Sequence, residues 1–359
     1  MGKQSAPRRE YTREFKVEAA AQNPRNAAGI SKGTRHLVKR FIRGSHLGQK
    51  RTLDTKSVNP DITYMRQATK IDPSRIKALA IDLDGTMLLP DSTLGTRTVR
   101  CLRRLVADGI QVIVCTGRAS EASRRYCEAI GAQGPMVFFN GAIVAEMPDA
   151  RPVSFGILPL DVVGYGADVA RGMDVHYQVF FPPSCDPENG ENRRETLVIE
   201  KRRGESEFYQ NHTGMVPVVA DLKEMAVSPD LPGAVKAMFI VDPMRHGEIR
   251  LKMSERFGER IYMTRTHPTF LEVMDARVSK GEGLKTVMKL RGLNPDEVIA
   301  FGDEENDLPM FAVAGFSAAP SSAREKVREA ADFVFGSNAE EGLAAFLEEL
   351  FGVGEHPDP

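Results

Sequence analysis

The stretch Ala78-Leu79-Ala80-Ile81-Asp82-Leu83-Asp84-Gly85-Thr86 decides the fold of this chain. Its first four residues are apolar, which predicts a buried strand of a parallel sheet, and Gly85 then turns the chain. Two carboxylates, Asp82 and Asp84, follow this strand directly. Buried charges persist only where a metal, a cation or hydrogen bonds compensate them, so the pair indicates a functional site. A strand end with two solvated aspartates is the alternative.

Two carboxylates at this spacing suit nucleophilic and acid–base chemistry. One of them can attack as a nucleophile. The other can give a proton to a leaving group and later take one from water. Because carboxylates this close repel each other, we expect a divalent cation beside them, and hard oxygen ligands favour Mg²⁺. The pair alone does not establish phosphoryl transfer.

Two further apolar runs predict strands, and the first of them ends in residues that can bind an anion. Residues 111–115 form the first run and lead into Thr116-Gly117-Arg118. A hydroxyl and free backbone N–H groups at a strand-to-helix turn suit an anion, although the same residues also make an ordinary helix cap. Arg118 is either a phosphate ligand or a surface residue with a salt bridge. Residues 136–139 form the second run, which ends in Asn140-Gly141-Ala142.

Two later features complete the pattern. Lys280 begins a predicted helix, where its charge opposes the helix dipole unless it faces a negative ligand; a solvated lysine is the alternative. Residues 298–301 form another apolar strand, which leads into Gly302-Asp303-Glu304-Glu305-Asn306-Asp307. Four acidic residues within five positions make a poor core but a good cation site.

Four of these features occur in the order of the four motifs of the haloacid dehalogenase-like hydrolases, and the chain resembles that family. They are the D-L-D-G-T motif, the threonine ending the second strand, the downstream lysine and the G-D-x-x-N-D motif. Asn140-Gly141-Ala142 and Val278-Ser279-Lys280-Gly281 are similar to the Cof-type branch, which carries its cap between motifs two and three. The resemblance spans about residues 77–350. It implies Mg²⁺-dependent hydrolysis of a phosphate monoester through an aspartyl-phosphate.

The resemblance also implies a role for each motif residue. Asp82 would be the nucleophile and Asp84 the general acid and base, with Thr116 and Lys280 completing the catalytic set. The implied Mg²⁺ ligands are the Asp82 side chain, the Asp84 backbone carbonyl and Asp303, with Asp307 supporting them. The implied substrate-binding residues are Thr116, Gly117, Asn140, Lys280 and Asn306.

Strands and helices alternate before about residue 150 and after about residue 270. This alternation predicts a Rossmann-like, doubly wound α/β core, a parallel sheet with helices on both faces, whose ligands bind at the carboxyl ends of the strands. Between these parts the pattern predicts an inserted α+β cap, with strands at 153–158, 175–181, 196–200, 235–241 and 270–274. The predicted boundaries are an arm at 1–74, a core at 75–152 and 268–351, a cap at 153–267 and a tail at 352–359.

A cap over the site would exclude bulk water and select the leaving group. Five polar and aromatic residues of this segment are candidates for setting substrate preference: His176, Tyr177, Arg193, Arg194 and His212. For each of them, the alternative is that it is an ordinary surface residue.

Composition and charge limit the remaining possibilities. The 359-residue chain is 42% hydrophobic and has no apolar run long enough for a transmembrane helix. Its four cysteines lack the spacing of a metal site. We therefore expect a cytoplasmic protein with reduced thiols. Residues 1–60 hold 14 Lys and Arg against 4 Asp and Glu. We expect this basic arm to be mostly disordered; it could hold nucleic acid, serve as a transit peptide, or have no function.

The function these observations favour is a Mg²⁺-dependent phosphatase for a small phosphorylated metabolite, such as a sugar phosphate or a phosphorylated cofactor. The expected partner is therefore a small phosphate ester, with no membrane, and with nucleic acid only as a weak possibility through the arm. A phosphomutase on the same scaffold and a non-enzymatic ligand-sensing module are the alternatives.

Overall fold

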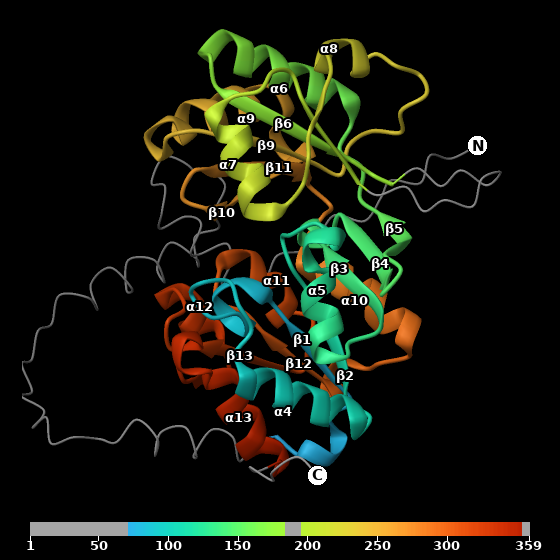
Figure 1. The fold of residues 1–359 in the computed structure, drawn as a ribbon, viewed down its shortest axis with the longest axis vertical. Helices are drawn as coiled ribbons and strands as arrows, with labels where there is room; N and C mark the ends of the chain where they lie inside the picture. The colour runs from blue at the N-terminus through green and yellow to red at the C-terminus, as the bar shows by residue number, and fades with distance from the viewer. Residues whose placement is uncertain (1–70, 184–194, 354–359) are drawn as a thin grey trace, which may run out of the picture. The chain divides into compact units, whose positions relative to one another are not determined.

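The computed structural model describes residues 71–183 and 195–353 (Figure 1). Almost all of the predicted arm and tail lie outside these residues. Within them, no helix has the length and apolar character that crossing a membrane requires.

The core is built on a sheet of five parallel strands in the order β14-β13-β12-β1-β2, with β1 between β12 and β2. Ala78 is paired with Gln111 on one side and Val298 on the other, so the three strands end at the same edge. This arrangement confirms the predicted parallel sheet. The bounds are β1 (Ala78–Ile81), β2 (Gln111–Val114), β12 (Val298–Phe301), β13 (Phe316–Pro320) and β14 (Phe333–Phe335).

Helices cover both faces of this sheet because alternate residues of a strand point to opposite sides. Leu79 and Ile81 pack with residues of α4, α5 and α13. Ala78 and Ala80 pack instead with residues of α10 and α11. The doubly wound α/β core is therefore confirmed. The helices are α4 (Thr96–Ala107), α5 (Ser120–Ile130), α10 (Lys280–Arg291), α11 (Leu308–Phe311), α12 (Glu325–Ala330) and α13 (Gly342–Phe351).

A three-stranded antiparallel sheet follows α5, in the order β3-β4-β5. It touches the parallel sheet through a parallel bridge between Cys115 and Val137. Its last strand overlaps the segment 153–158 that the sequence pattern places in the cap, yet it pairs with β4. The bounds are β3 (Gly134–Phe138), β4 (Ile143–Met147) and β5 (Arg151–Phe155).

The cap is a mixed six-stranded sheet in the order β10-β11-β9-β6-β7-β8. One face packs against helices α6 and α9, while Phe180, Met238 and Phe270 of the other face join the hydrophobic cluster of the core. The cap strands are β6 (His176–Phe181), β7 (Thr196–Ile199), β8 (Val218–Val219), β9 (Lys236–Ile240), β10 (Ile261–His267) and β11 (Phe270–Asp275). The cap helices are α6 (Leu160–Met173), α7 (Gly204–Thr213), α8 (Leu222–Met225) and α9 (His246–Phe257).

The exact points where the chain passes between core and cap stay predictions. Strand β11 pairs with β9 from Phe270 to Val273, so it belongs to the cap sheet although the predicted core resumes at residue 268. The pairing favours a second crossing after Asp275. The strand predicted at 270–274 was counted among those of the cap, and its pairing with β9 agrees with that prediction.

Candidate active site

The chain turns sharply after β1, and this turn brings the first and fourth motifs together. Residues Leu83–Met87 form one π-helical turn, in which Gly85 has a φ of +80°. A Cβ at Gly85 would lie 2.2 Å from Oδ2 of Asp303. Glycine therefore serves both the left-handed backbone and the close approach of the loop after β12. Thr86 adds a hydrogen bond of 2.9 Å from its hydroxyl to Oδ1 of Asp303.

Lys280, the first residue of α10, lies buried between two carboxylates. Its Nζ donates to Oδ1 of Asp82 at 2.5 Å and to Oδ1 of Asp307 at 2.6 Å. Burial alone would lower the pKa of Lys280, but the negative charges of Asp307 and Asp82 outweigh it and raise the pKa. The lysine is therefore a permanent cation at the helix start, and it faces negative groups as its position in the sequence suggested.

Asp307 fixes the loop after β12 from within. Its Oδ2 accepts the backbone N–H groups of Asp303 at 2.9 Å and Glu304 at 3.0 Å, while its Oδ1 accepts from Lys280. The side chain is fully buried. Asp307 thus connects the loop backbone to the lysine and holds Asp303 beside Asp82.

The side chains of Asp82, Asp303 and Asp307 each offer one oxygen within 4.8 Å of the others. Burial raises the pKa of Asp82, and the charges of Asp307 and Asp303 raise it further. Burial also raises the pKa of Asp303 to about 7, with Asp307 again adding to the shift. Among the described residues, this cluster sets three carboxylates against the single ammonium of Lys280. An all-oxygen donor set with excess negative charge fits a hard divalent cation.

Asp84 lies apart from that cluster and pairs with Arg118. The guanidinium donates to both carboxylate oxygens, Nε to Oδ2 at 2.7 Å and an Nη to Oδ1 at 2.5 Å. It also donates to the hydroxyl of Tyr126 at 3.1 Å. The Asp84 side chain is 52% exposed and that of Arg118 only 14%. Of the two roles predicted for Arg118, the structure favours the salt bridge, although this bridge lies at the cavity rather than on an open surface.

In the turn after β2, Thr116 is buried whereas Gly117 lines the cavity. Thr116 is fully buried, and its Oγ1 accepts the backbone N–H of Arg118 at 3.1 Å. Gly117 lines the cavity and its carbonyl accepts Nζ of Lys236 at 3.2 Å. The predicted anion-binding turn therefore lies next to Asp84. It is fixed by a hydrogen bond between its own residues, Arg118 and Thr116, and by one from Lys236 of the cap.

Asn140 and Asn306 are in direct contact. Asn306 donates from Nδ2 to Oδ1 of Asn140 at 2.9 Å, and Asn140 donates from Nδ2 to Oε2 of Glu272 at 2.9 Å. Asn140 has a φ of +56°, a left-handed conformation that asparagine tolerates well. Two sequence-predicted residues thus form one hydrogen-bonded chain that continues into the cap.

The sequence analysis missed Lys236 and Glu272. Their side chains are each 2% exposed and form an ion pair of 2.8 Å. A signal was present, because Lys236 is the one charged residue of the strand Lys236–Ile240 and Glu272 lies between apolar residues of the strand Phe270–Asp275, where a buried charge needs a partner.

Most of these groups line a cavity of about 480 Å³, whereas Thr116, Asn140, Lys280 and Asp307 are not among its lining residues. The core contributes the motif side chains and the cap contributes its sheet and α7. The residues named above that line it are Asp82, Asp84, Gly85, Gly117, Arg118, Lys236, Glu272, Asp303 and Asn306, and the cap adds Tyr209, Met238 and Phe270.

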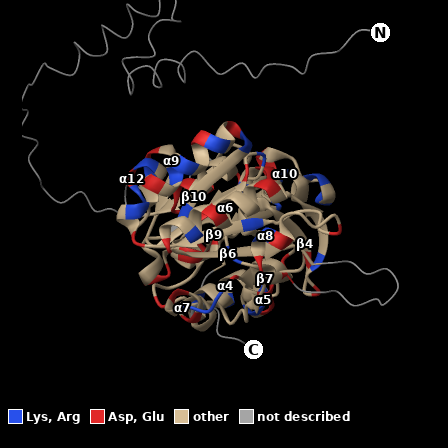
Figure 2. Cartoon of the chain, turned by 90° about the horizontal axis from the view of Figure 1, so that it is seen from above, with Lys and Arg blue, Asp and Glu red and all other residues tan. Residues whose placement is uncertain are grey.

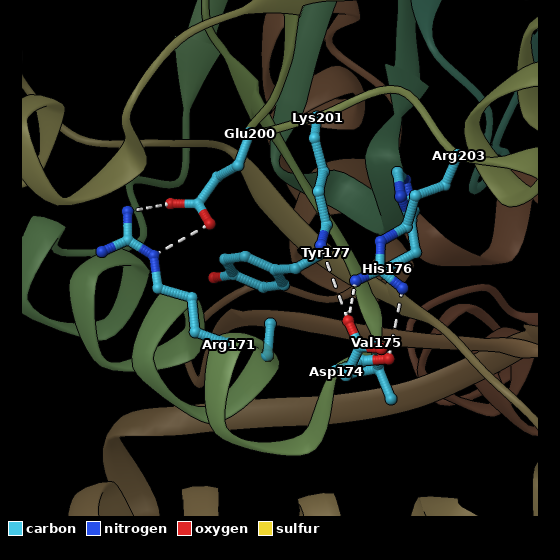
Figure 3. Close-up of a pocket in the computed structure, with 9 residues that line it drawn as sticks. Arg171, Asp174, Val175, His176, Tyr177, Glu200, Lys201 and Arg203 are labelled. Carbon is cyan, nitrogen blue, oxygen red and sulfur yellow. Dashed lines mark hydrogen bonds and ion pairs between the residues drawn. The ribbon is translucent and has the colours of Figure 1, made fainter.

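A separate cavity of about 360 Å³ lies in the cap (Figure 3). It is lined by His176 and Tyr177, two of the candidates for substrate preference, which do not line the catalytic cavity. Its charged groups pair with one another: Arg171 donates to Glu200, and Arg203 to Asp174. Arg193 and Arg194 lie outside the described residues, as does the His212 side chain.

The remaining charges of the fourth motif are paired at the surface. Glu304 accepts from Arg324 and Glu305 accepts from Lys326. Figure 2 shows Lys and Arg mixed with Asp and Glu across the described helices and strands. Glu304 and Glu305 are therefore held by basic residues and do not belong to the carboxylate cluster of Asp82, Asp303 and Asp307.

A sequence profile of the haloacid dehalogenase-like hydrolases matches residues 79–347, three quarters of the chain. The chain belongs to this family. It is 29% identical to the 5-amino-6-(5-phospho-D-ribitylamino)uracil phosphatase YitU of Bacillus subtilis, over 77% of this chain and 97% of that protein. It is 28% identical to a phosphoglycolate phosphatase of Methanopyrus kandleri, over 75% of this chain and 94% of that protein.

The fold of this haloacid dehalogenase-like hydrolase is shared with solved structures. The crystal structure of TM0651 from Thermotoga maritima superposes with a TM-score of 0.64 and 26% identity, over 79% of this chain and 98% of that one. A mixed-sheet cap inserted between the second and third motifs is the arrangement of the Cof-type branch that the sequence resembles. By homology the chain is a phosphoric monoester hydrolase.

Proposed function

We propose that this hydrolase is a Mg²⁺-dependent phosphatase that acts on a small phosphorylated metabolite through an aspartyl-phosphate on Asp82. The observation that carries the proposal is the position of Asp82. It is buried at the end of β1, bonded to Lys280, grouped with Asp303 and Asp307, and in contact with a cavity of about 480 Å³.

In the first half of the reaction, a carboxylate oxygen of Asp82 attacks phosphorus and the bond to the leaving-group oxygen breaks. Asp84 gives its proton to that oxygen, and Arg118 holds the Asp84 carboxyl at the cavity. In the second half, water attacks the phosphorus of the aspartyl-phosphate and Asp84 takes its proton. Inorganic phosphate leaves and Asp82 is regenerated.

The remaining polar groups stabilise charge. Phosphoryl transfer depends mainly on positioning and on neutralising the charge of the equatorial oxygens. Lys280 supplies a fixed positive charge, while Thr116, Gly117 and Asn306 are the proposed phosphoryl contacts. Asp82, Asp303 and Asp307 would hold Mg²⁺, with the Asp84 carbonyl as the further proposed ligand. When bound, Mg²⁺ would neutralise these carboxylates and polarise the phosphoryl oxygens.

The proposed substrates are small phosphate esters. Relatives named for a ribityl-pyrimidine phosphate and for phosphoglycolate support this class, and sugar phosphates belong to the same size range. We also place the enzyme in the cytoplasm, a location supported by the free thiols of Cys101, Cys115 and Cys127.

The test is phosphate release from a panel of these esters, with Mg²⁺ and with EDTA, for the unmodified protein and for Asp82→Asn. Metal-dependent release that the variant lacks is expected. Release that persists in EDTA or in the variant would contradict the proposal. Transfer of the phosphoryl group back to the substrate, detected as a bisphosphate, would indicate a phosphomutase instead.

A further inference from the structure

The buried ion pair between Lys236 and Glu272 belongs to the cap, yet each member bonds to the core. Lys236 Nζ donates to Glu272 at 2.8 Å and to the carbonyl oxygen of Gly117 at 3.2 Å. Glu272 also accepts Nδ2 of Asn140 at 2.9 Å. Both side chains are 2% exposed. Two fully desolvated charges are a weak source of stability, so this placement calls for another explanation.

Lys236 acts on the turn that the proposed function assigns to phosphate binding. All three carbonyl groups of this turn are fixed: Thr116 accepts from the Asn140 N–H, Gly117 from Lys236, and Arg118 from the Phe139 N–H. Lys236 is the contribution of the cap to this set. It also lies 4.9 Å from the centre of the Phe139 ring, over the same segment.

The Gly117 carbonyl controls the threonine hydroxyl through one peptide plane. Because a trans peptide is planar, its C=O and N–H groups point in opposite directions. Holding the carbonyl of Gly117 toward Lys236 therefore aims the N–H of Arg118 away from it, and this N–H donates to Oγ1 of Thr116 at 3.1 Å. A hydroxyl that already accepts a hydrogen bond has its own proton to give to another acceptor, and the proposed function assigns that place to a phosphoryl oxygen.

Glu272 provides a second connection. It holds Asn140, and the amide oxygen of Asn140 holds Nδ2 of Asn306 in the fourth motif. The pair thus reaches two of the catalytic motifs from the cap, and both members line the catalytic cavity.

We propose that Lys236 and Glu272 are positioning residues that couple the closed cap to phosphate binding, Lys236 through the Thr116–Arg118 turn and Glu272 through Asn140 and Asn306. With the cap against the core, the turn and the asparagines are in place to receive the phosphoryl group. Without the pair, the cap can still cover the cavity but no longer orders these groups. This inference rests on the proposed phosphatase activity.

The experiment uses the full chain with both charges removed, Lys236→Met with Glu272→Gln, so that no unpaired charge remains buried. Arg171→Met is the control, because it removes ion pairs of the cap, with Glu200 and Asp221, that the core does not share. Three quantities are measured: kcat/KM for the best metabolite of the panel, kcat/KM for p-nitrophenyl phosphate, and the affinity for inorganic phosphate by calorimetry.

We expect the double variant to fold, to bind inorganic phosphate roughly tenfold more weakly, and to lose kcat/KM by a similar factor on both substrates. Lys236→Arg, which keeps a cation and donors, should retain more activity than Lys236→Met. The Arg171→Met control should match the unmodified protein in all three quantities.

Two outcomes would overturn the inference. Unchanged phosphate affinity in the folded double variant would mean that the pair has only a structural role. A loss confined to the metabolite would mean that the pair contacts the leaving group instead. Failure of the proposed function can be told apart from failure of this inference, because the unmodified protein would then release no phosphate from any ester. The affinities of the variants for inorganic phosphate could still be compared with that of the unmodified protein.

Discussion

Two buried lysines of this protein, one in the core and one in the cap, are surrounded by different amounts of charge. Lys280 faces Asp82 and Asp307, with Asp303 beside them, so negative charge is in excess. Among the described residues, Lys236 pairs with one carboxylate, that of Glu272, and it also contacts a carbonyl and two aromatic rings. The excess negative charge of the core cluster can be neutralised by a bound cation, whereas the charge of Lys236 is already matched by that of Glu272. If the proposed function is right, this difference separates the groups that react from those that position them.

The largest expected effect comes from the core cluster. Asp82→Asn should lower kcat by at least about a thousandfold, because the amide cannot attack phosphorus, while the fold stays intact. Phosphate release measures the loss of turnover, and circular dichroism shows whether the variant is folded. Appreciable turnover in the folded variant would show that the nucleophile is misassigned.

The balanced pair predicts a stability effect instead. Lys236→Met should lower the free energy of unfolding by about 3–5 kcal/mol, because it leaves the Glu272 carboxylate buried without its cation. Adding Glu272→Gln should recover most of this loss. Urea denaturation of the single and double variants measures both steps, and an equally unstable double variant would argue that the pair stabilises the fold directly.

The excess charge of the core cluster predicts a dependence on pH. Because the pKa of Asp303 is raised to about 7 in the folded protein, this group binds a proton that the unfolded chain releases near pH 3.8. Its contribution to the free energy of unfolding should therefore decrease as the pH rises from about 4 to about 7. Mg²⁺ must displace that proton, so stabilisation by Mg²⁺ should grow over the same interval.

Melting temperatures at about pH 5.5 and about pH 8, with and without Mg²⁺, test this dependence; Mg²⁺ at a hundred times its Kd adds about 2.7 kcal/mol. Asp303→Asn should reduce both the pH slope and the Mg²⁺ effect. A Mg²⁺ effect that is larger at the lower pH would contradict the assigned cluster.

The smallest effect is expected at the surface of the cap. Arg171 forms ion pairs with Glu200 and Asp221, and the arginine side chain is 45% exposed. Water and salt screen such a pair, so Arg171→Met should leave both the melting temperature and kcat/KM unchanged within error. A clear loss of activity would mean that the cap cavity of Figure 3 influences catalysis.

The core cluster was predictable because its residues follow strand ends in a fixed order. Asp82 comes directly after one short apolar run and Asp303 one residue after another, and parallel strands bring such ends to one edge. The cap pair was not predictable in this way. Lys236 and Glu272 are far apart in the sequence, and they meet only through the register of β9 and β11.

The same limit explains the segments that the sequence analysis placed differently. Local pattern identifies a strand, but the partner of that strand depends on the whole fold. Strand β5 overlaps the first predicted cap strand and pairs with β4 instead, whereas β11 joins the cap sheet, as its prediction among the cap strands implied. The role of Arg118 was open for a similar reason, since Asp84 lies 34 residues before it.

The most direct test of the central claim is to trap the phosphoryl-enzyme. Asp84→Asn should still form the aspartyl-phosphate from an activated ester such as p-nitrophenyl phosphate, but hydrolyse it slowly, since no base activates water. Rapid quenching with Mg²⁺ present, followed by mass spectrometry of peptides, locates the phosphoryl group. The account predicts it on Asp82. Phosphate release without any phosphoryl-enzyme, or a phosphoryl group on another residue, would contradict it.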